Sequence, residues 1–312
     1  MKLYSDSELP VRPALEAVHA ATLASFVGAG SWYSGAERCE IVMEARRARC
    51  EAGLQEDGAV APHYADINAT ARRVAAKVAT SVEDLSRDFM EEAIAQGLSI
   101  DEYVEVVGVV SRAVNLDVFA RGLGLPVRQL PSPQSGVPAR TRPATARDEG
   151  AWVPTVPGGS RGGDDAQRIY GSADPQAAPF IYRALSLCPD EAAGLVALGA
   201  AQYLEIKDFM DLEFTYEPAL SRPQYELLAA NASWTVGGQF TTQATAVGIR
   251  SRAQEIARQI ESFATRRAEE IRALGDEEAS VYVAEMNQNP QLAVFLREVE
   301  FLKSTYTRKV TL

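Results

Sequence analysis

The residues best suited to redox or acid–base chemistry are few and widely spaced in this chain. Its 312 residues include three cysteines, Cys39, Cys50 and Cys188, and two histidines, His19 and His63. No two cysteines form a C-x-x-C pair, and an odd number does not suggest a disulfide framework. The two histidines are not in H-x-x-x-H spacing, so we predict no bound metal.

Cys50 has the strongest case for reactivity among the cysteines. Arginines flank it in the sequence and could stabilise a thiolate, and Glu37 could serve as a base. His63 follows Cys50 and is a candidate proton carrier. The competing interpretation is that Cys50 packs as a small apolar residue, Glu37 favours a helix start, and His63 lies in solvent.

The elements that must position these residues are helices. Ser34 and Glu37 have the spacing of a capping box, and Ser81 with Asp84 and Ser99 with Glu102 start similar segments. Apolar residues then recur at helical spacing, and β-branched alternation is scarce. We therefore predict an all-α fold, with helices over 11–29, 36–52, 63–79, 81–97, 99–122, 178–187, 189–209, 222–247, 248–274, 276–288 and 290–304.

A long proline- and glycine-rich segment separates two helical halves. From Pro126 to Gly163 no regular element is expected, since proline removes backbone donors and glycine adds freedom. Trp152 lies in an apolar island of this segment, which favours docking on the body of the protein. We predict an N-terminal half over 1–125, a linker over 126–163 and a C-terminal half over 164–312.

A family resemblance emerges from one segment in each half. The sequence SRPQYELLAANASWTVGGQFTTQATA, from Ser221, and the sequence GAERCEIVMEARRARCEAG, from Gly35, both carry an early acid and an Ala-rich stripe. They resemble the signature helices of the alkylhydroperoxidase D-like and carboxymuconolactone decarboxylase-like superfamily. The resemblance implies a duplicated alkylhydroperoxidase D-like fold. It also implies thiol chemistry at a C-x-x-C-x-x-x-H motif, assisted by a glutamate.

The residues at the motif positions depart from that pattern. When Glu226 is aligned with the family glutamate, Gly238 and Thr241 replace the two cysteines and Thr245 replaces the histidine. Glycine has no side chain, and threonine cannot cycle between thiol and disulfide. The threonines could instead hydrogen-bond a polar ligand, or they could bond back to helix carbonyls.

In the first half, one thiol of the motif is left. Cys50 stands at the first cysteine, Gly53 at the second and Asp57 at the histidine. We therefore expect a protein that has lost the dithiol peroxidase site and has a repurposed pocket for a small molecule. If it is an enzyme, we expect a peroxidase-related oxidoreductase or a cofactor-free acid–base enzyme. The alternative is a non-catalytic binding or scaffolding protein that keeps the fold.

Composition and charge limit the possible partners. The net charge is −11 and the sequence pI is about 4.9, which disfavours binding to nucleic acid or to an anionic membrane. No apolar run is long enough to span a bilayer, and we expect a cytoplasmic protein. The resemblance also implies a homo-oligomer, a dimer or trimer, with a monomer as the alternative.

Overall fold

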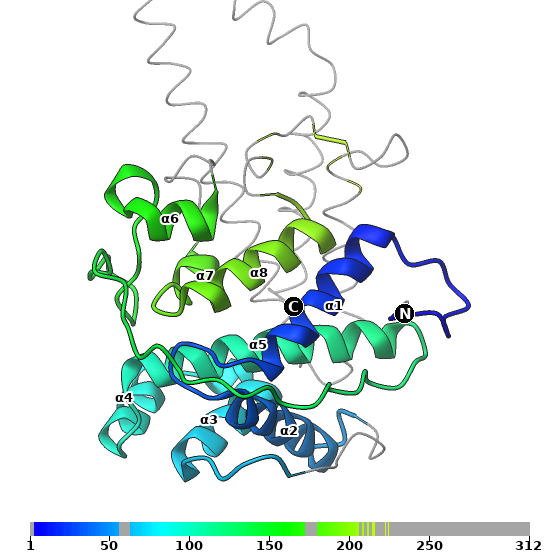
Figure 1. Ribbon diagram of the computed structural model, residues 1–312, viewed down its shortest axis with the longest axis horizontal. Helices are drawn as coiled ribbons and strands as arrows, with labels where there is room; N and C mark the ends of the chain where they lie inside the picture. Colours follow the sequence, from blue (N-terminus) through cyan, green and yellow to red (C-terminus); the bar gives the residue numbers. More distant parts are fainter. Residues whose placement is uncertain are drawn as a thin grey trace, which may run out of the picture. The chain divides into compact units, whose positions relative to one another are not determined.

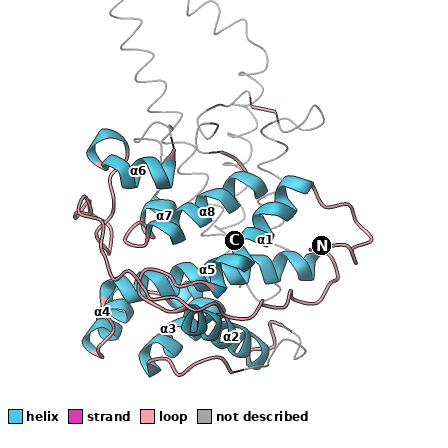
Figure 2. Ribbon diagram, in the orientation of Figure 1, coloured by secondary structure: helices cyan, strands magenta, loops and turns pink. Residues whose placement is uncertain are grey.

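The computed structural model describes residues 3–55, 63–171 and 180–205, together with six single residues between 208 and 224. The chain divides into two compact units, Met1–Val236 and Gly237–Leu312, and the described residues belong to the first. Within them there are eight α-helices and no strand, which confirms the predicted all-α class (Figure 2). The helices predicted from residue 222 onward, apart from two single residues, lie outside this part of the chain.

The helices follow one another in the order shown in Figure 1. Their bounds are α1 Pro13–Val27, α2 Gly35–Glu51, α3 Ala69–Thr80, α4 Arg87–Ala95, α5 Ile100–Gly122, α6 Gly163–Tyr170, α7 Phe180–Arg183 and α8 Pro189–Gln202. Two single 3-10 turns, Val82–Asp84 and Gly159–Arg161, precede α4 and α6.

Local sequence signals account for where α2 and α5 begin. The Ser34 side chain accepts a hydrogen bond from the Glu37 backbone N–H, and the Glu37 carboxylate accepts one from Ser34 N. Ser99 and Glu102 make the same reciprocal pair at α5. Each capping box satisfies backbone donors that would otherwise be unpaired at the helix start. Both were predicted from the sequence, and both are confirmed.

Helix α5 is the central element of the described unit. It packs against α2 and α3 on one side and against α1 and α8 on the other, as Figure 1 shows. Its apolar residues are therefore buried on several faces, with Val106, Val109 and Val110 all without exposed surface. A helix covered on both sides needs apolar residues around much of its circumference. This position lets polar residues of α5 reach the interior of the protein.

The proline-rich segment is a strap over the helices, which we define as residues 126–162. It starts at the C-terminal end of α5 and runs back toward α4 (Figure 1). Its backbone bonds to the body, with Gln134 N donating to Val27 O at 2.8 Å and Arg140 N donating to Ser31 O at 2.8 Å. The apolar island docks through Val153 and Val156, which are buried, whereas Trp152 remains 48% exposed.

Several helix boundaries differ from the sequence predictions. The segment predicted as a helix from Ser81 makes a 3-10 turn first, and α4 begins only at Arg87, because Ser86 provides a second N-cap to Phe89 N. Helix α6 was not predicted at all, since its start is hidden among the glycines.

The predicted division into two related halves stays a prediction. Helix α8 packs against α1 and α5, and α6 packs against α8, all within the first compact unit, and the second unit begins at Gly237. Most residues of 164–312 lie outside the described part of the chain.

Candidate functional site

Glu37 and Cys50 lie at opposite ends of α2. They are 13 residues apart on one helix, which at 1.5 Å per residue places them about 20 Å apart. Glu37 uses its carboxylate to bind Ser34 N and Ser34 Oγ, at 2.8 and 2.7 Å. Its observed role is therefore that of a helix cap, and the structure does not bring it to Cys50.

The arginines near Cys50 are engaged elsewhere. Arg46 binds both oxygens of Asp117, at 2.9 and 2.7 Å. Arg47 pairs with Glu40 and Glu44, and Arg49 donates to a backbone carbonyl of α3 at 3.0 Å. All three guanidinium groups thus have oxygen partners of their own. Arg49 also interacts electrostatically with Cys50, so arginine activation of the Cys50 thiol stays a prediction.

His63 lies beside Glu40, an acid that the sequence analysis did not single out. His63 Nδ1 is 3.2 Å from Glu40 Oε1, and His63 Nε2 is 3.5 Å from Asp66 Oδ1. Burial raises the pKa of Glu40, but hydrogen bonds from Tyr64 N and Arg47 outweigh burial and leave that pKa below its ordinary value. Glu40 is ten residues, or about 15 Å, from Cys50 along α2. His63 and Cys50 therefore do not form a thiol–base pair.

The remaining predicted site residues cannot be placed. Glu226, Gly238, Thr241 and Thr245 lie outside the described residues, as does Asp57. The family-like motif of the second half therefore stays a prediction.

The polar cluster with the greatest burial lies between α2, α5 and α8. Arg38 of α2 pairs with Glu105 of α5 at 2.5 Å and with Glu191 of α8 at 2.8 Å. Arg112 of α5 pairs with the other oxygen of Glu191 and donates to Ser25 Oγ at 3.0 Å. The side chains of the four charged residues are at most 3% exposed. We call Arg38, Glu105, Glu191 and Arg112 the buried charge network.

Each acid of the network has a different electrostatic environment. Burial raises the pKa of Glu105 to about 7, although Arg38 favours its ionised form. Burial also opposes ionisation of Glu191, but Arg112 and Arg38 outweigh it and lower the pKa of Glu191 below its ordinary value. Glu191 also lies in the first turn of α8, where the helix dipole favours a negative charge.

Three glycines make room for the network. A Cβ atom on Gly30 would overlap the Glu105 carboxylate and the Arg38 guanidinium. One on Gly108 would lie 2.8 Å from Glu191 Cβ, and one on Gly194 would lie 2.5 Å from Arg112 Nη1. The close approach of these backbones to charged side chains explains why no larger residue fits there.

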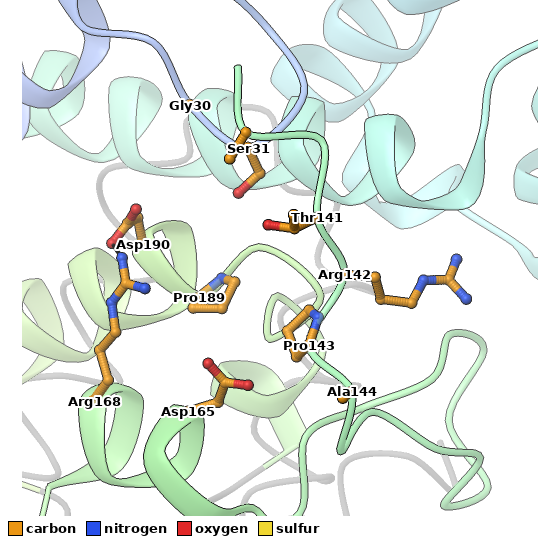
Figure 3. A pocket seen from close by; sticks show the side chains of 11 residues that line it. Gly30, Ser31, Thr141, Arg142, Pro143, Ala144, Asp165, Arg168, Pro189 and Asp190 are labelled. Carbon is orange, nitrogen blue, oxygen red and sulfur yellow. Dashed lines mark hydrogen bonds and ion pairs between the residues drawn. The ribbon is translucent and has the colours of Figure 1, made fainter. Parts of the chain in front are cut away.

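An open cleft of about 320 Å³ lies next to the buried charge network. Gly30 and Ser31 line it from the α1–α2 loop, the strap lines it over 139–144, and α6 and α8 contribute Asp165, Arg168, Pro189 and Asp190. In Figure 3 the Asp165 carboxylate and the Ser31 and Thr141 hydroxyls lie around the opening, and the Arg142 guanidinium points away from it.

Buried contacts fix the walls of this cleft. Trp32 N donates to Glu105 Oε2 at 2.5 Å, directly after the lining residues Gly30 and Ser31. Glu191, adjacent to the lining residue Asp190, is held by two arginines. Arg142 of the strap binds both oxygens of Asp101 at the start of α5, at 2.8 and 2.6 Å. The cleft is therefore formed by segments that the buried charges and the strap hold in place.

A second buried polar group lies near the other end of α8. His19 has no exposed surface, and its Nε2 accepts a hydrogen bond from Gln202 Nε2 at 2.9 Å. Its Nδ1 then carries the proton and donates to Tyr4 Oη, 2.7 Å away. Burial lowers the pKa of His19 to about 4. These contacts describe a neutral histidine of the core.

The cysteines and carboxylates of the described residues do not assemble a metal centre. No group of three or more His, Cys, Asp or Glu side chains in this part of the chain is placed to hold a metal ion. None of the three cysteines forms a disulfide bond. No helix in the described residues is both long and apolar enough to cross a membrane.

Comparison with protein-family models, with curated proteins and with solved structures finds no match to this chain.

Neither Glu40 nor the buried charge network is predicted from the sequence. The sequence did contain a signal for burial of Glu40, because this acid interrupts a run of apolar residues, Cys39, Ile41 and Val42, which are buried in α2. Glu191 gave no such signal, since an acid after proline at a helix start is typical of an exposed first turn.

Proposed function

We propose that this protein has lost dithiol peroxidase chemistry and binds a small molecule in the cleft between the α1–α2 loop, the strap, α6 and α8. The supporting observation is that polar groups converge on this cleft and not on Cys50. Hydroxyls and charged side chains from four segments surround the cleft. By contrast, Glu37 and Cys50 lie at opposite ends of α2, and His63, outside that helix, contacts Glu40.

A comparison with the chemical requirements of a thiol peroxidase supports the proposal that this protein has lost that activity. The reaction needs a thiolate, a nearby base and a resolving thiol. Cys50 has neither Glu37 nor His63 within reach, and the other two cysteines of the chain, Cys39 and Cys188, are fully buried. Burial raises the pKa of Cys39 to about 11, and it raises the pKa of Cys188 still further. The family-like origin and the duplication remain part of this proposal.

The preorganised walls support a binding role for the cleft. Burying four charges costs free energy that well-packed apolar residues would not require. Here the charges fix two cleft-lining segments, those around Ser31 and Asp190. A volume of about 320 Å³ suits a ligand at the small end of the metabolite range.

Two measurements test this proposal. Peroxide consumption with a dithiol reductant should be at the buffer level for the wild type and for Cys50→Ser. A ligand panel of small cations, anions and polyols should yield binding that Ala144→Trp abolishes by filling the cleft. Val137→Trp, on the same strap but 89% exposed and away from the cleft, is the matched control. Dithiol-dependent turnover, or ligand binding unaffected by Ala144→Trp, would contradict the proposal.

The second candidate is a non-catalytic scaffold that assembles as a homo-oligomer in the cytoplasm. The observation favouring it is that all four residues of the buried charge network already have partners within the chain. Light scattering on the full chain tests the assembly. A mass that stays at 33.7 kDa as the sample is concentrated would contradict a dimer or trimer.

A further inference from the structure

The charges that line the cleft are not evenly neutralised. Two arginines and two aspartates contribute to its walls. Arg142 is bound by Asp101 through both oxygens, and its guanidinium points away from the opening (Figure 3). Arg168 pairs with Asp190 at the rim, where both side chains are more than half exposed. The two positive charges are therefore already matched by carboxylates.

Asp165 is the charged lining residue that is left over. It is half-buried, and among the described residues no hydrogen bond or ion pair holds its carboxylate. It lies in the first turn of α6, which stabilises a negative charge. In Figure 3 this carboxylate points toward the space between Pro189 and Pro143. Its neighbour Asp164, on the same helix turn, is exposed and does not line the cleft.

Two hydroxyl groups line the cleft in addition to the Asp165 carboxylate. Thr141 from the strap and Ser31 from the α1–α2 loop present hydroxyl oxygens that can accept hydrogen bonds. The Ser31 hydroxyl also hydrogen-bonds to the Cys188 sulfur, which leaves its oxygen as an acceptor. A ligand with several N–H and O–H donors would satisfy all of these oxygens. An anion would instead meet the unpaired carboxylate and would be disfavoured by like-charge repulsion.

We infer that the cleft binds a small hydroxylated ammonium compound, of the amino-alcohol class. The ammonium group donates to Asp165, and the ligand hydroxyl bonds to Thr141 and Ser31. This inference rests on the proposed binding role of the cleft and adds the chemistry of the ligand. The contact is a charge-assisted hydrogen bond to a half-buried carboxylate, so binding weakens as salt screens the pair.

Titration calorimetry on the full-length chain tests the ammonium contact, with ethanolamine as the probe. Asp165→Asn should weaken ethanolamine binding by about tenfold, the usual effect of removing the charge from such a hydrogen bond. Asp164→Asn removes the same charge from the same helix turn but leaves the cleft intact. Its affinity should remain within about twofold of the wild type, because an exposed charge outside the cleft contributes little.

A second pair of probes tests the hydroxyl contact. Ethylammonium, which lacks the hydroxyl group, should bind several-fold more weakly than ethanolamine, consistent with the loss of about 1 kcal/mol for a neutral hydrogen bond. Thr141→Val should reduce that difference, since it removes one hydroxyl partner. Equal ethanolamine affinity of Asp165→Asn and Asp164→Asn would overturn the inference.

The failures of the two proposals can be told apart. The protein could bind acetate or phosphate but not ethanolamine, and Ala144→Trp could abolish that anion binding. This result would overturn the ammonium inference and leave the cleft as a binding site. Absence of binding for every cation, anion and polyol tested would overturn both.

Discussion

The two ends of α2 present a contrast. At its C-terminal end, Cys50 carries the residue type that points most directly to chemistry, yet its flanking arginines bind other partners. At its N-terminal end, Arg38 enters the buried charge network beneath the cleft, next to a loop of small residues that looked unremarkable in the sequence. The contrast teaches that converging partners, and not residue type alone, define a candidate site.

The largest expected effect comes from breaking the network at α8. Glu191→Gln leaves Arg38 and Arg112 without the carboxylate that both bind, and removing one partner of a buried pair costs on the order of 3–5 kcal/mol. We expect that loss in urea unfolding followed by tryptophan fluorescence. Asp190→Asn, one residue away, removes only the exposed pair with Arg168 and should cost less than about 1 kcal/mol. Similar losses for the two variants would contradict the importance of the network.

Overpacking should produce the next largest effect. Gly30→Ala forces a methyl group into the Glu105 carboxylate and the Arg38 guanidinium, and overpacking typically costs about 1–3 kcal/mol. Gly28→Ala is the control, because no atom lies within 4 Å of its added Cβ and its φ of −87° suits alanine. That variant should stay within about 0.5 kcal/mol of the wild type. The Gly30 variant should also weaken ligand binding, since this residue lines the cleft.

The titration of Glu105 gives a pH-dependent effect of intermediate size. Its pKa is about 7 in the folded protein, whereas the ordinary value for an exposed glutamate is 4.5. Between these values the folded state binds more protons than the unfolded state, so this group makes the protein less stable as the pH rises from about 4.5 to 7. Urea unfolding of the wild type and Glu105→Gln at several pH values tests the sign. The wild type should lose on the order of 1–3 kcal/mol relative to the variant over that range.

A wild type that gains stability relative to Glu105→Gln as the pH rises would show the opposite shift. It would mean that Arg38 and the hydrogen bond from Trp32 N lower the pKa of Glu105 by more than burial raises it.

The smallest effect concerns Glu37, for which a role as a functional acid and a role as a helix cap predict different results. If Glu37 acts as a cap, Glu37→Ala should cost about 1 kcal/mol in unfolding free energy. Glu102→Ala at the matching capping box of α5 should then cost a similar amount. A loss of ligand binding in Glu37→Ala, without a change in stability, would contradict the capping role and restore Glu37 as a functional acid.

The sequence predicted best the features that depend on neighbouring residues. The capping boxes at Ser34 and Ser99 follow from residues three positions apart, and both are confirmed. The predicted start of α4 was wrong, because Ser81 makes no side-chain cap hydrogen bond and Ser86, five residues later, caps the helix instead. Helix α6 escaped notice because its first residue, Gly163, has a φ of 55° and follows other glycines.

The cleft could not have been predicted from local patterns. Its walls combine residues near 30, 140, 165 and 190, which only the tertiary fold brings together. The apolar island around Trp152 correctly predicted that the strap docks on the body, but its buried anchors are Val153 and Val156, and Trp152 itself is half exposed. Buried acids such as Glu105 are visible only once the partner helix supplies an arginine.

The strap also bears on how this protein can diversify. It contributes the wall at 139–144 while forming no α-helix of its own, and its ends are attached separately to α5 and α6. Insertions and substitutions in an irregular surface segment disturb the core far less than changes within a packed helix. Under the proposed binding role, ligand preference can therefore change through the strap while the helical scaffold stays the same. For the same reason, the strap is the natural place to graft new recognition residues.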